Sequence, residues 1–275
     1  QYTHFKSITF SSTHLTSEGF RRLPVDCGLF QSVLTLDLAS SGINDDSLQT
    51  LNIFKNLKHL NIDHTSITGV GFSKLKDIHE TLETLWLIDC PMTEAGFSEI
   101  ANFTNLKTLV VNRTDFDDQS VQFVSGTVEE IQANQTKLTD TGLTALTDHL
   151  TLKHLSLDQT LVSPAGLIRS LQKLDQLKSL SVNQMSLHNW IDKLVAVLAN
   201  GSLQDLSAAL NGLDDADILK LASLPHLRTL TVLEYLTEKE PERNRYTLKT
   251  IFSLVASERE RLGLEKLELM TFILF

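Results

Sequence analysis

The chain has 275 residues and a formal net charge of −10 at pH 7, with 24 lysine and arginine residues against 34 acidic ones. Nucleic acids and anionic membrane surfaces are bound by clustered positive charge, and the sequence has no basic stripe, so we expect neither as a partner. Its apolar runs are also far shorter than the roughly 20 residues that a membrane-spanning helix needs. Composition therefore argues against both classes of partner and against a membrane-spanning helix.

A hydrophobic pattern returns about every 24 residues, from Phe5 almost to the C-terminus. It reads L-x-x-L-x-L-x-x-T-x-L-T-x-x-G-L and is clearest over residues 57–72, 128–143 and 152–167. Positions 3 to 7 alternate polar and apolar residues, which predicts a short strand with one buried face. Counted from their first apolar residue, the repeats begin at Phe5, Val33, Leu57, Leu82, Leu106, Val128, Leu152, Leu177, Leu203, Leu227 and Leu264.

Position 12 of the repeat holds residues that cap helices. Such side chains accept hydrogen bonds from the unpaired N–H groups of a first helical turn. Pro164, next to one of them, stands where its missing N–H costs nothing. We therefore predict a helix in the second half of each repeat. His188, at position 12 of the eighth repeat, is the one residue that is not of a capping type. The capping residues are Thr16, Asn44, Thr68, Thr93, Asp117, Thr139, Ser163 and Asp214.

The period and the leucine pattern resemble those of the leucine-rich repeat family, whose fold is a curved solenoid. The resemblance covers almost the whole chain. It implies an α/β horseshoe of about eleven repeats, with a parallel sheet on the concave side and helices on the convex side. The T-x-x-G-L ending is similar to repeats of F-box-type ubiquitin ligase receptors and of some bacterial proteins. In the F-box members position 9 is usually Cys, whereas here it is mostly Thr, with Cys only at Cys90.

In this family the side chain at position 9 turns inward and hydrogen-bonds the backbone of the bend after the strand. A hydroxyl or an amide can do this and Met185 cannot, so we expect the eighth repeat to be irregular over residues 185–200. Trp190 is expected in the core, beside a helix over residues 191–198. No linker interrupts the repeats, so residues 1–275 are predicted to form a single domain. Because neither end has a polar cap, we take that domain to be part of a longer protein.

The register breaks a second time over residues 235–262. The charged segment 237–245 predicts a solvated loop. A helix is predicted over residues 246–261, with one apolar face turned to the core. The residues of that face are Leu248, Ile251, Phe252, Leu254 and Val255.

Repeats three to five carry the candidate binding site on the concave face. Trp86, with Ile88 and Val110 beside it, makes an apolar spot on the expected concave face. A position-5 side chain cannot reach the core, so the burial of Trp86 would need a partner. A large aromatic with an arginine and a polar rim is the composition of a protein-binding hot spot. Alternatively, Trp86 packs on its neighbours and Asp89–Arg113 is a solvated pair of little energetic value. The polar residues around the spot are His59, Asn61, Asp63, His64, Asp89 and Arg113.

No motif of metal, nucleophilic or phosphate-binding chemistry occurs in the sequence, so we expect no enzyme activity, cofactor, metal or small-molecule substrate. The leading hypothesis is a recognition module that binds a partner protein through its concave face. The family resemblance adds the role of a substrate receptor or adaptor. Two alternatives remain: a scaffold that packs on another domain or a second copy through the apolar end at residues 273–275, and a bacterial effector acting on host proteins.

Cysteines and glycosylation sequons bear on the compartment. The only cysteines are Cys27 and Cys90, without the terminal cysteine clusters of extracellular repeat proteins, which favours a reducing cytoplasmic location. Sequons at Asn102, Asn112, Asn134 and Asn200 favour the alternative of a secreted receptor ectodomain.

Overall fold

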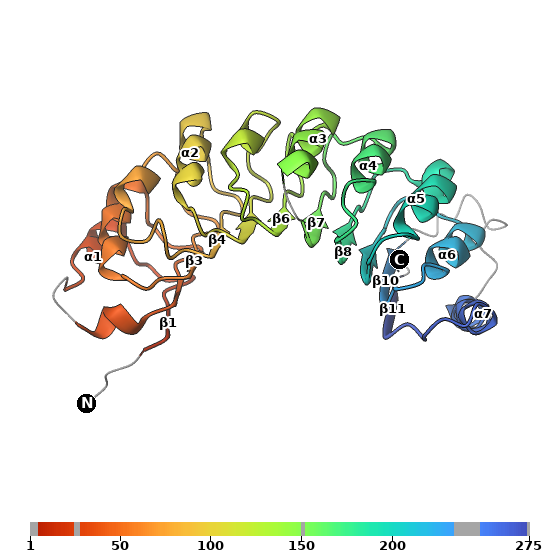
Figure 1. Cartoon of the computed structure of the whole chain (residues 1–275). Helices are drawn as coiled ribbons and strands as arrows, with labels where there is room; N and C mark the ends of the chain where they lie inside the picture. The colour runs from red at the N-terminus through yellow and green to blue at the C-terminus, as the bar shows by residue number, and fades with distance from the viewer. Residues whose placement is uncertain (1–4, 25–27, 150–151, 234–247, 274–275) are drawn as a thin grey trace. The chain divides into compact units, whose positions relative to one another are not determined.

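The computed structural model describes residues 5–24, 28–149, 152–233 and 248–273. The chain divides into two compact units, Gln1–Leu138 and Thr139–Phe275. In each unit short strands lie along one side and helices along the other (Figure 1). The predicted loop 237–245 and the last residues of the apolar end, 274–275, lie outside the described residues. No helix in the described ranges has both the length and the apolar character that crossing a membrane requires.

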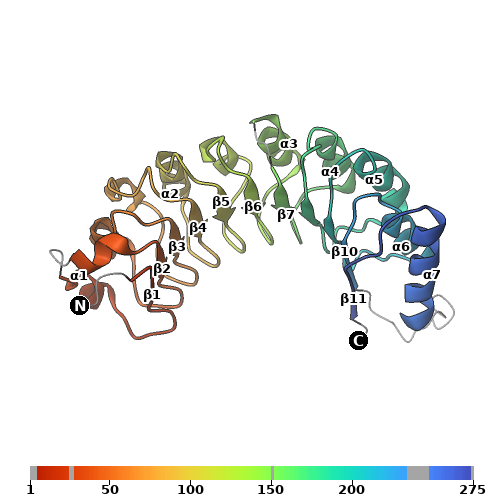
Figure 2. The same cartoon turned by 60° about the horizontal axis from the view of Figure 1, so that its bottom comes forward.

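The N-terminal unit contains six strands that pair in chain order, and every pair is parallel (Figure 2). The register aligns equal repeat positions, so that Asn61 lies opposite Trp86 and Trp86 opposite Val110. The parallel sheet predicted from the period-two alternation is therefore confirmed. The strands are β1 (Ser7–Thr9), β2 (Thr35–Asp37), β3 (His59–Asn61), β4 (Thr84–Trp86), β5 (Thr108–Val110) and β6 (Glu130–Gln132).

Helical segments cover the other side of this unit, and most of them are 3₁₀ turns rather than the expected α-helices. A 3₁₀ helix is favoured in such short connections, where a chain must turn within a few residues. The segments are α1 (Ser17–Arg21), η1 (Gly28–Ser32), η2 (Asp45–Ile53), η3 (Phe72–Lys74), α2 (Glu94–Ser98), η4 (Glu99–Asn102) and η5 (Ser120–Phe123).

The predicted caps form in most of these repeats. Thr16 and Thr93 each accept a hydrogen bond from the N–H of a glycine three residues later, at 3.2 and 3.1 Å. Thr68 is an exception, because its own N–H and hydroxyl both donate to Asp45 of the preceding repeat at 2.8 Å. Its 3₁₀ turn then begins later, after Gly71, without a side-chain cap.

The C-terminal unit also has parallel strands that pair in chain order, but its helices are mostly α-helical. The strands are β7 (His154–Ser156), β8 (Ser179–Ser181), β9 (Asp205–Ser207), β10 (Thr229–Leu233) and β11 (Leu269–Ile273). The helices are α3 (Asp140–His149), α4 (Pro164–Leu171), η6 (His188–Trp190), α5 (Ile191–Leu198), α6 (Asp215–Ala222) and α7 (Leu248–Arg261).

The core of each unit lies between strands and helices and is built from positions 1, 4 and 6 of the repeats. In the third repeat these are Leu57, Leu60 and Ile62, all 0% exposed. Each such burial contributes roughly 1.5–3 kcal/mol. Phenylalanines from the helical side fill the remaining space, and the rings of Phe72 and Phe103 meet edge to face with centroids 5.6 Å apart. The stacked leucines thus hold successive strands in one register.

The glycine of the T-x-x-G-L ending is required by close packing between repeats. A Cβ at Gly96 would lie 1.9 Å from the carbonyl oxygen of Thr68. A Cβ at Gly166 would lie 2.1 Å from the carboxylate of Asp140. Only a residue without a side chain lets one repeat approach the next this closely.

The position-9 prediction is confirmed by inward hydrogen bonds. The hydroxyl of Thr65, for example, donates to the carbonyl of Ile62 at 2.7 Å. Met185 is buried at the equivalent position, and its thioether side chain has no hydrogen to donate to that carbonyl. Asn211 of the next repeat compensates: its amide donates to the carbonyl of Val182 at 2.9 Å and accepts from the N–H of Met185 at 2.8 Å. A side chain of the next repeat therefore bonds the carbonyl that a position-9 hydroxyl would otherwise meet.

Two expectations about the C-terminal unit need correction. Helix α5 covers the predicted residues, but Trp190 is only half-buried, and the ammonium of Lys193 lies 4.6 Å from its ring centroid. On α7, Leu254 is 38% exposed, whereas Val255 and Arg259 are buried. Residues four apart share a helix face, so the pair 255 and 259 defines the inward side. The side chains of residues 248, 251 and 252 lie outside what the structure describes.

Candidate functional site

The nine predicted site residues all lie in the N-terminal unit, on strands β3, β4 and β5 or in the turn after each strand. We call this set the Trp86 surface. Trp86 is partly exposed in the middle of it, with Asn61 opposite on one side and Val110 on the other. The full set is His59, Asn61, Asp63, His64, Trp86, Ile88, Asp89, Val110 and Arg113.

Val110 is 1% exposed, which corrects the expectation that a position-5 side chain cannot be buried without a partner. Its strand neighbours in register are Trp86 and Gln132, both larger and both partly exposed. Side chains directly opposite one another on adjacent strands lie close together, so two large ones can keep water away from a smaller one between them. Val110 therefore contributes to the floor of the surface rather than to its open part, while Trp86 and Ile88 remain accessible.

An ion-paired group borders the apolar part. The guanidinium of Arg113 donates to the carboxylate of Asp89, with Nε 2.9 Å from Oδ1 and 2.8 Å from Oδ2. On the other side of this carboxylate, Nδ1 of His64 lies 3.1 Å from Oδ2. The hydrogen bond from Arg113 holds the pKa of Asp89 below its usual value. His59 is held separately, with its Nδ1 3.0 Å from the hydroxyl of Thr84. The pair predicted from sequence exists, but an exposed ion pair contributes at most about 1 kcal/mol. Its consequence is orientation: Arg113 is held in one geometry.

The backbone of the turns also fixes this geometry. His64, Asp89 and Arg113 occupy position 8, and each has φ of +55°. Non-glycine residues rarely adopt such left-handed backbone. Here it recurs at position 8 of the first nine repeats, so it belongs to the turn of the repeat rather than to a local distortion. The other residues of this kind are Ser12, Ser40, Gln135, Gln159, Gln184 and Leu210.

Asp63 differs from the remaining polar residues because it is only 8% exposed. Its Oδ1 accepts a hydrogen bond from the N–H of Ile88 in the next repeat, at 2.6 Å. Burial raises the pKa of Asp63, and the negative charges of Asp37 and Asp89 act in the same direction, against the N–H of Ile88 and the charge of His64. The carboxylate is therefore held in surroundings that disfavour its charge.

The same link between repeats recurs at position 7, which sequence reasoning missed. Asn112 accepts from the N–H of Asn134 at 2.8 Å, and Asn183 accepts from that of Ala209 at 2.6 Å. The signal was present in the sequence as a recurrent Asp or Asn at position 7. The pattern within one repeat does not show the bond, because the N–H donor belongs to the next repeat.

A second feature outside the sequence prediction lies at the start of the strands. Lys58 and Lys107 both donate to Glu83, at 2.7 and 3.0 Å, beside a hollow of about 540 Å³. These hydrogen bonds lower the pKa of Glu83 to about 2. All three residues occupy position 2 of successive repeats. The negative charge of Glu83 is balanced by the two lysines, so we assign these residues a role in holding successive repeats together.

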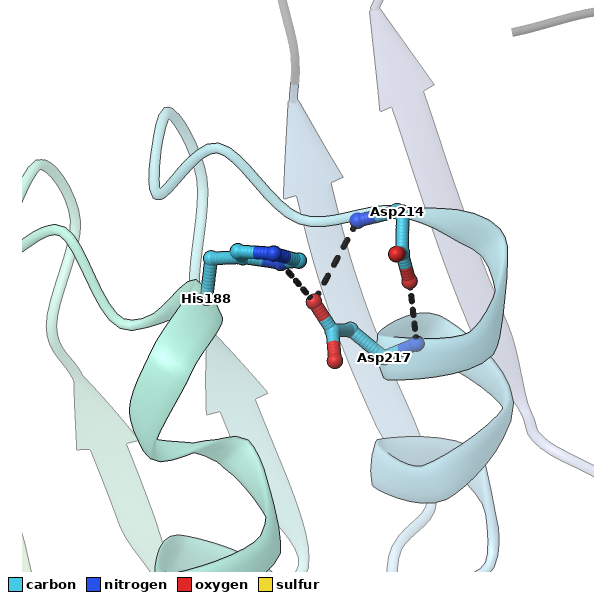
Figure 3. A group of neighbouring side chains, drawn as sticks. All are labelled: His188, Asp214 and Asp217. Atoms are coloured by element: carbon cyan, nitrogen blue, oxygen red, sulfur yellow. Dashed lines mark hydrogen bonds and ion pairs between the residues drawn. The ribbon is translucent and has the colours of Figure 1, made fainter. Parts of the chain in front are cut away.

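One group of described residues brings three potential metal-ligand atoms within 4.8 Å of one another: His188, Asp214 and Asp217 (Figure 3). Asp214 caps α6 by accepting from the N–H of Asp217 at 2.9 Å, and Asp217 returns a bond to the N–H of Asp214 at 3.4 Å. His188 Nδ1 lies 2.5 Å from Asp217 Oδ2. These contacts form a capping box extended by a histidine. His188, which does not cap its own helix, thus supports the next one.

Parallel strands at positions 3 to 5, inward donors at position 9 and left-handed turns at position 8 recur together along the chain. Each unit has the leucine-rich repeat fold. No protein-family model matches the sequence, and no curated protein does. This leucine-rich repeat chain is, however, similar to solved structures. One is in the yeast complex of Rad7 and Elc1, with 19% identity, a TM-score of 0.49, and coverage of 90% of this chain and 81% of that chain. Another is the leucine-rich repeat ectodomain of the Arabidopsis thaliana receptor kinase GASSHO1/SCHENGEN3, in complex with CASPARIAN STRIP INTEGRITY FACTOR 2. It has 17% identity, a TM-score of 0.43, and coverage of 85% of this chain and 28% of that chain.

Proposed function

We propose that this leucine-rich repeat chain is a recognition module that binds a partner protein through the Trp86 surface. One observation carries the proposal: Trp86 is partly exposed on the sheet face, and Arg113 of the next repeat is already oriented by its bonds to Asp89. Tryptophan and arginine are the residues most enriched in binding hot spots. Partner contact would remove the indole from water and leave the Asp89–Arg113 pair at the rim.

The surface is prepared for binding in two ways. The strand that carries Trp86 is paired on both sides, and Val110, opposite Trp86 on one of those sides, is buried. The left-handed turns fix the backbone from which Asp89 and Arg113 project. A surface that is rigid before binding loses less conformational entropy on association. This supports recognition by a preformed face rather than by a loop that orders on contact.

Affinity capture from cell lysate tests the proposal, with bound proteins identified by mass spectrometry. We expect Trp86→Ala to lose the specific partners, with affinity at least about tenfold weaker, as for a hot-spot residue. Trp190→Ala is the matched control, because it removes the other half-buried tryptophan from the C-terminal unit. Partners retained equally by a folded Trp86→Ala/Arg113→Ala double variant would refute the assignment.

The finer role that we propose is substrate receptor or adaptor in the cytoplasm. The T-x-x-G-L repeats and the absence of terminal cysteine clusters from the sequence support it. Captured components of a ubiquitin ligase would support this role. A mobility shift after deglycosylation of the protein from its native source would instead support a secreted ectodomain.

A further inference from the structure

We propose that the partner's anchor on the Trp86 surface is a cationic side chain, lysine or arginine, that lies against the indole of Trp86 and pairs with the carboxylate of Asp63. This inference rests on the proposed function and specifies what the surface recognises. It is carried by a comparison between two repeats of the same chain.

Asp158 is the counterpart of Asp63 in the C-terminal unit, and both of its oxygens are satisfied. Oδ1 accepts from the N–H of Asn183 at 2.8 Å and from the hydroxyl of Ser181 at 2.7 Å, and Oδ2 accepts from the amide of Asn183 at 2.8 Å. The donors are therefore the side chains at positions 5 and 7 of the following repeat.

In the repeat that follows Asp63, those two positions hold Trp86 and Ile88. The backbone N–H of Ile88 still donates to Oδ1, but no hydrogen bond reaches Oδ2 from any residue in the described ranges. A residue that is 8% exposed thus has one carboxylate oxygen that no donor in the described ranges reaches, two residues after Asn61, which lies opposite Trp86. Buried carboxylates are normally paired, and a donor from outside would complete this one.

The charges around Asp63 select a cation rather than a neutral donor. The negative charges of Asp37 and Asp89 both raise the pKa of Asp63. The nearby cation Arg113 already donates its hydrogen bonds to Asp89. An anionic group would meet three carboxylates here, whereas an ammonium or guanidinium would relieve the burial of one of them.

The aromatic half of the proposed contact has an example within the chain. The ammonium of Lys193 lies 4.6 Å from the ring centroid of Trp190. Trp86 has no such cation over its ring among the residues that the structure describes. An indole face attracts a cation through its quadrupole, and arginine and lysine are the protein groups that use this.

The test uses Nα-acetyl-arginine amide and Nα-acetyl-lysine amide as probes and Nα-acetyl-norleucine amide as the neutral control. Trp190→Phe leaves Trp86 as the only tryptophan, so its fluorescence and its indole N–H resonance report on this surface alone. We expect saturable changes with a cationic probe, none with norleucine amide, and binding at least about tenfold weaker in Asp63→Asn.

Asp63→Asn is a conservative variant because Asn112 and Asn183 make the same inter-repeat bond elsewhere in the chain. It keeps the acceptor for Ile88 and removes only the charge. Asp158→Asn is its control, and circular dichroism confirms folding of both. Equal probe binding by Asp63→Asn, or no saturable change with either cationic probe at millimolar concentration, overturns the proposal.

Partner capture separates this inference from the function on which it rests. Loss of partners in both Trp86→Ala and Asp63→Asn supports the cationic anchor. Partners lost in Trp86→Ala but retained in Asp63→Asn would leave the binding surface in place and refute the anchor. Capture that is indifferent to Trp86 would refute the proposed function itself.

Discussion

Arg259 should be the residue on which the end of the C-terminal unit depends most. It is 2% exposed on α7, and its guanidinium donates only to backbone carbonyls. Nε donates to Glu265 at 2.5 Å, Nη1 to Ala222 at 2.8 Å and Leu224 at 3.2 Å, and Nη2 to Leu227 at 3.0 Å. One side chain therefore ties α7 to the end of α6, to the turn before β10 and to the segment before β11.

Replacing Arg259 by Met leaves four carbonyl acceptors without their donor. Hydrogen bonds to a charged group contribute roughly 1.5–3 kcal/mol each, or about 6–12 kcal/mol together. Against this stands the cost of burying the guanidinium, several kcal/mol, which is also why burial lowers the pKa of Arg259. We therefore expect a net loss of about 3–5 kcal/mol in the free energy of unfolding.

Urea denaturation measures this loss, and hydrogen exchange with mass spectrometry locates it. Exchange should rise over residues 248–273 before the rest of the unit, because α7 and β11 are held through this side chain. Arg261→Met is the control: its guanidinium is exposed and pairs only with Glu258, so we expect a change below about 0.5 kcal/mol. An Arg259→Met variant within 1 kcal/mol of wild type, on the order of one ordinary hydrogen bond, would refute the reasoning.

Three further variants test the contacts between repeats. The pKa of Glu83 falls from 4.5 to about 2 on folding, so its stabilisation is complete above pH 4.5 and is lost as the pH falls towards 2. Glu83→Gln should cost about 1 kcal/mol at pH 7, after screening, and only a small part of that at pH 2, where half of the carboxyl groups are protonated, measured by urea denaturation at both values. Gly96→Ala should lower the unfolding free energy by about 2–3 kcal/mol, because its Cβ would overlap the carbonyl of Thr68; an unchanged melting temperature would contradict this packing. Asn211→Thr should cost about 2 kcal/mol, and adding Met185→Thr should recover part of it by supplying the missing hydroxyl, whereas additive losses in the double-mutant cycle would argue against this compensation.

The sequence alone determined the architecture, because its signals are local and repeated. Alternation over five residues specifies a strand with one buried face, and a leucine at fixed spacing specifies how that strand stacks on the next. The capping residue at position 12 and the inward residue at position 9 act within three residues of their partners, as Thr93 and Thr65 show. The position of the Trp86 surface on the sheet also follows from this register.

The tertiary structure decided what each side chain meets in the neighbouring repeat. Val110 is buried because of its neighbours in register, and one oxygen of the Asp63 carboxylate has no donor because Trp86 and Ile88 stand where another repeat has polar side chains. Arg259 finds three of its four carbonyl acceptors more than thirty residues away in sequence. A repeat pattern states which positions are polar or apolar. It cannot state which side chains of separate repeats satisfy one another, because that depends on distances that only the folded backbone fixes.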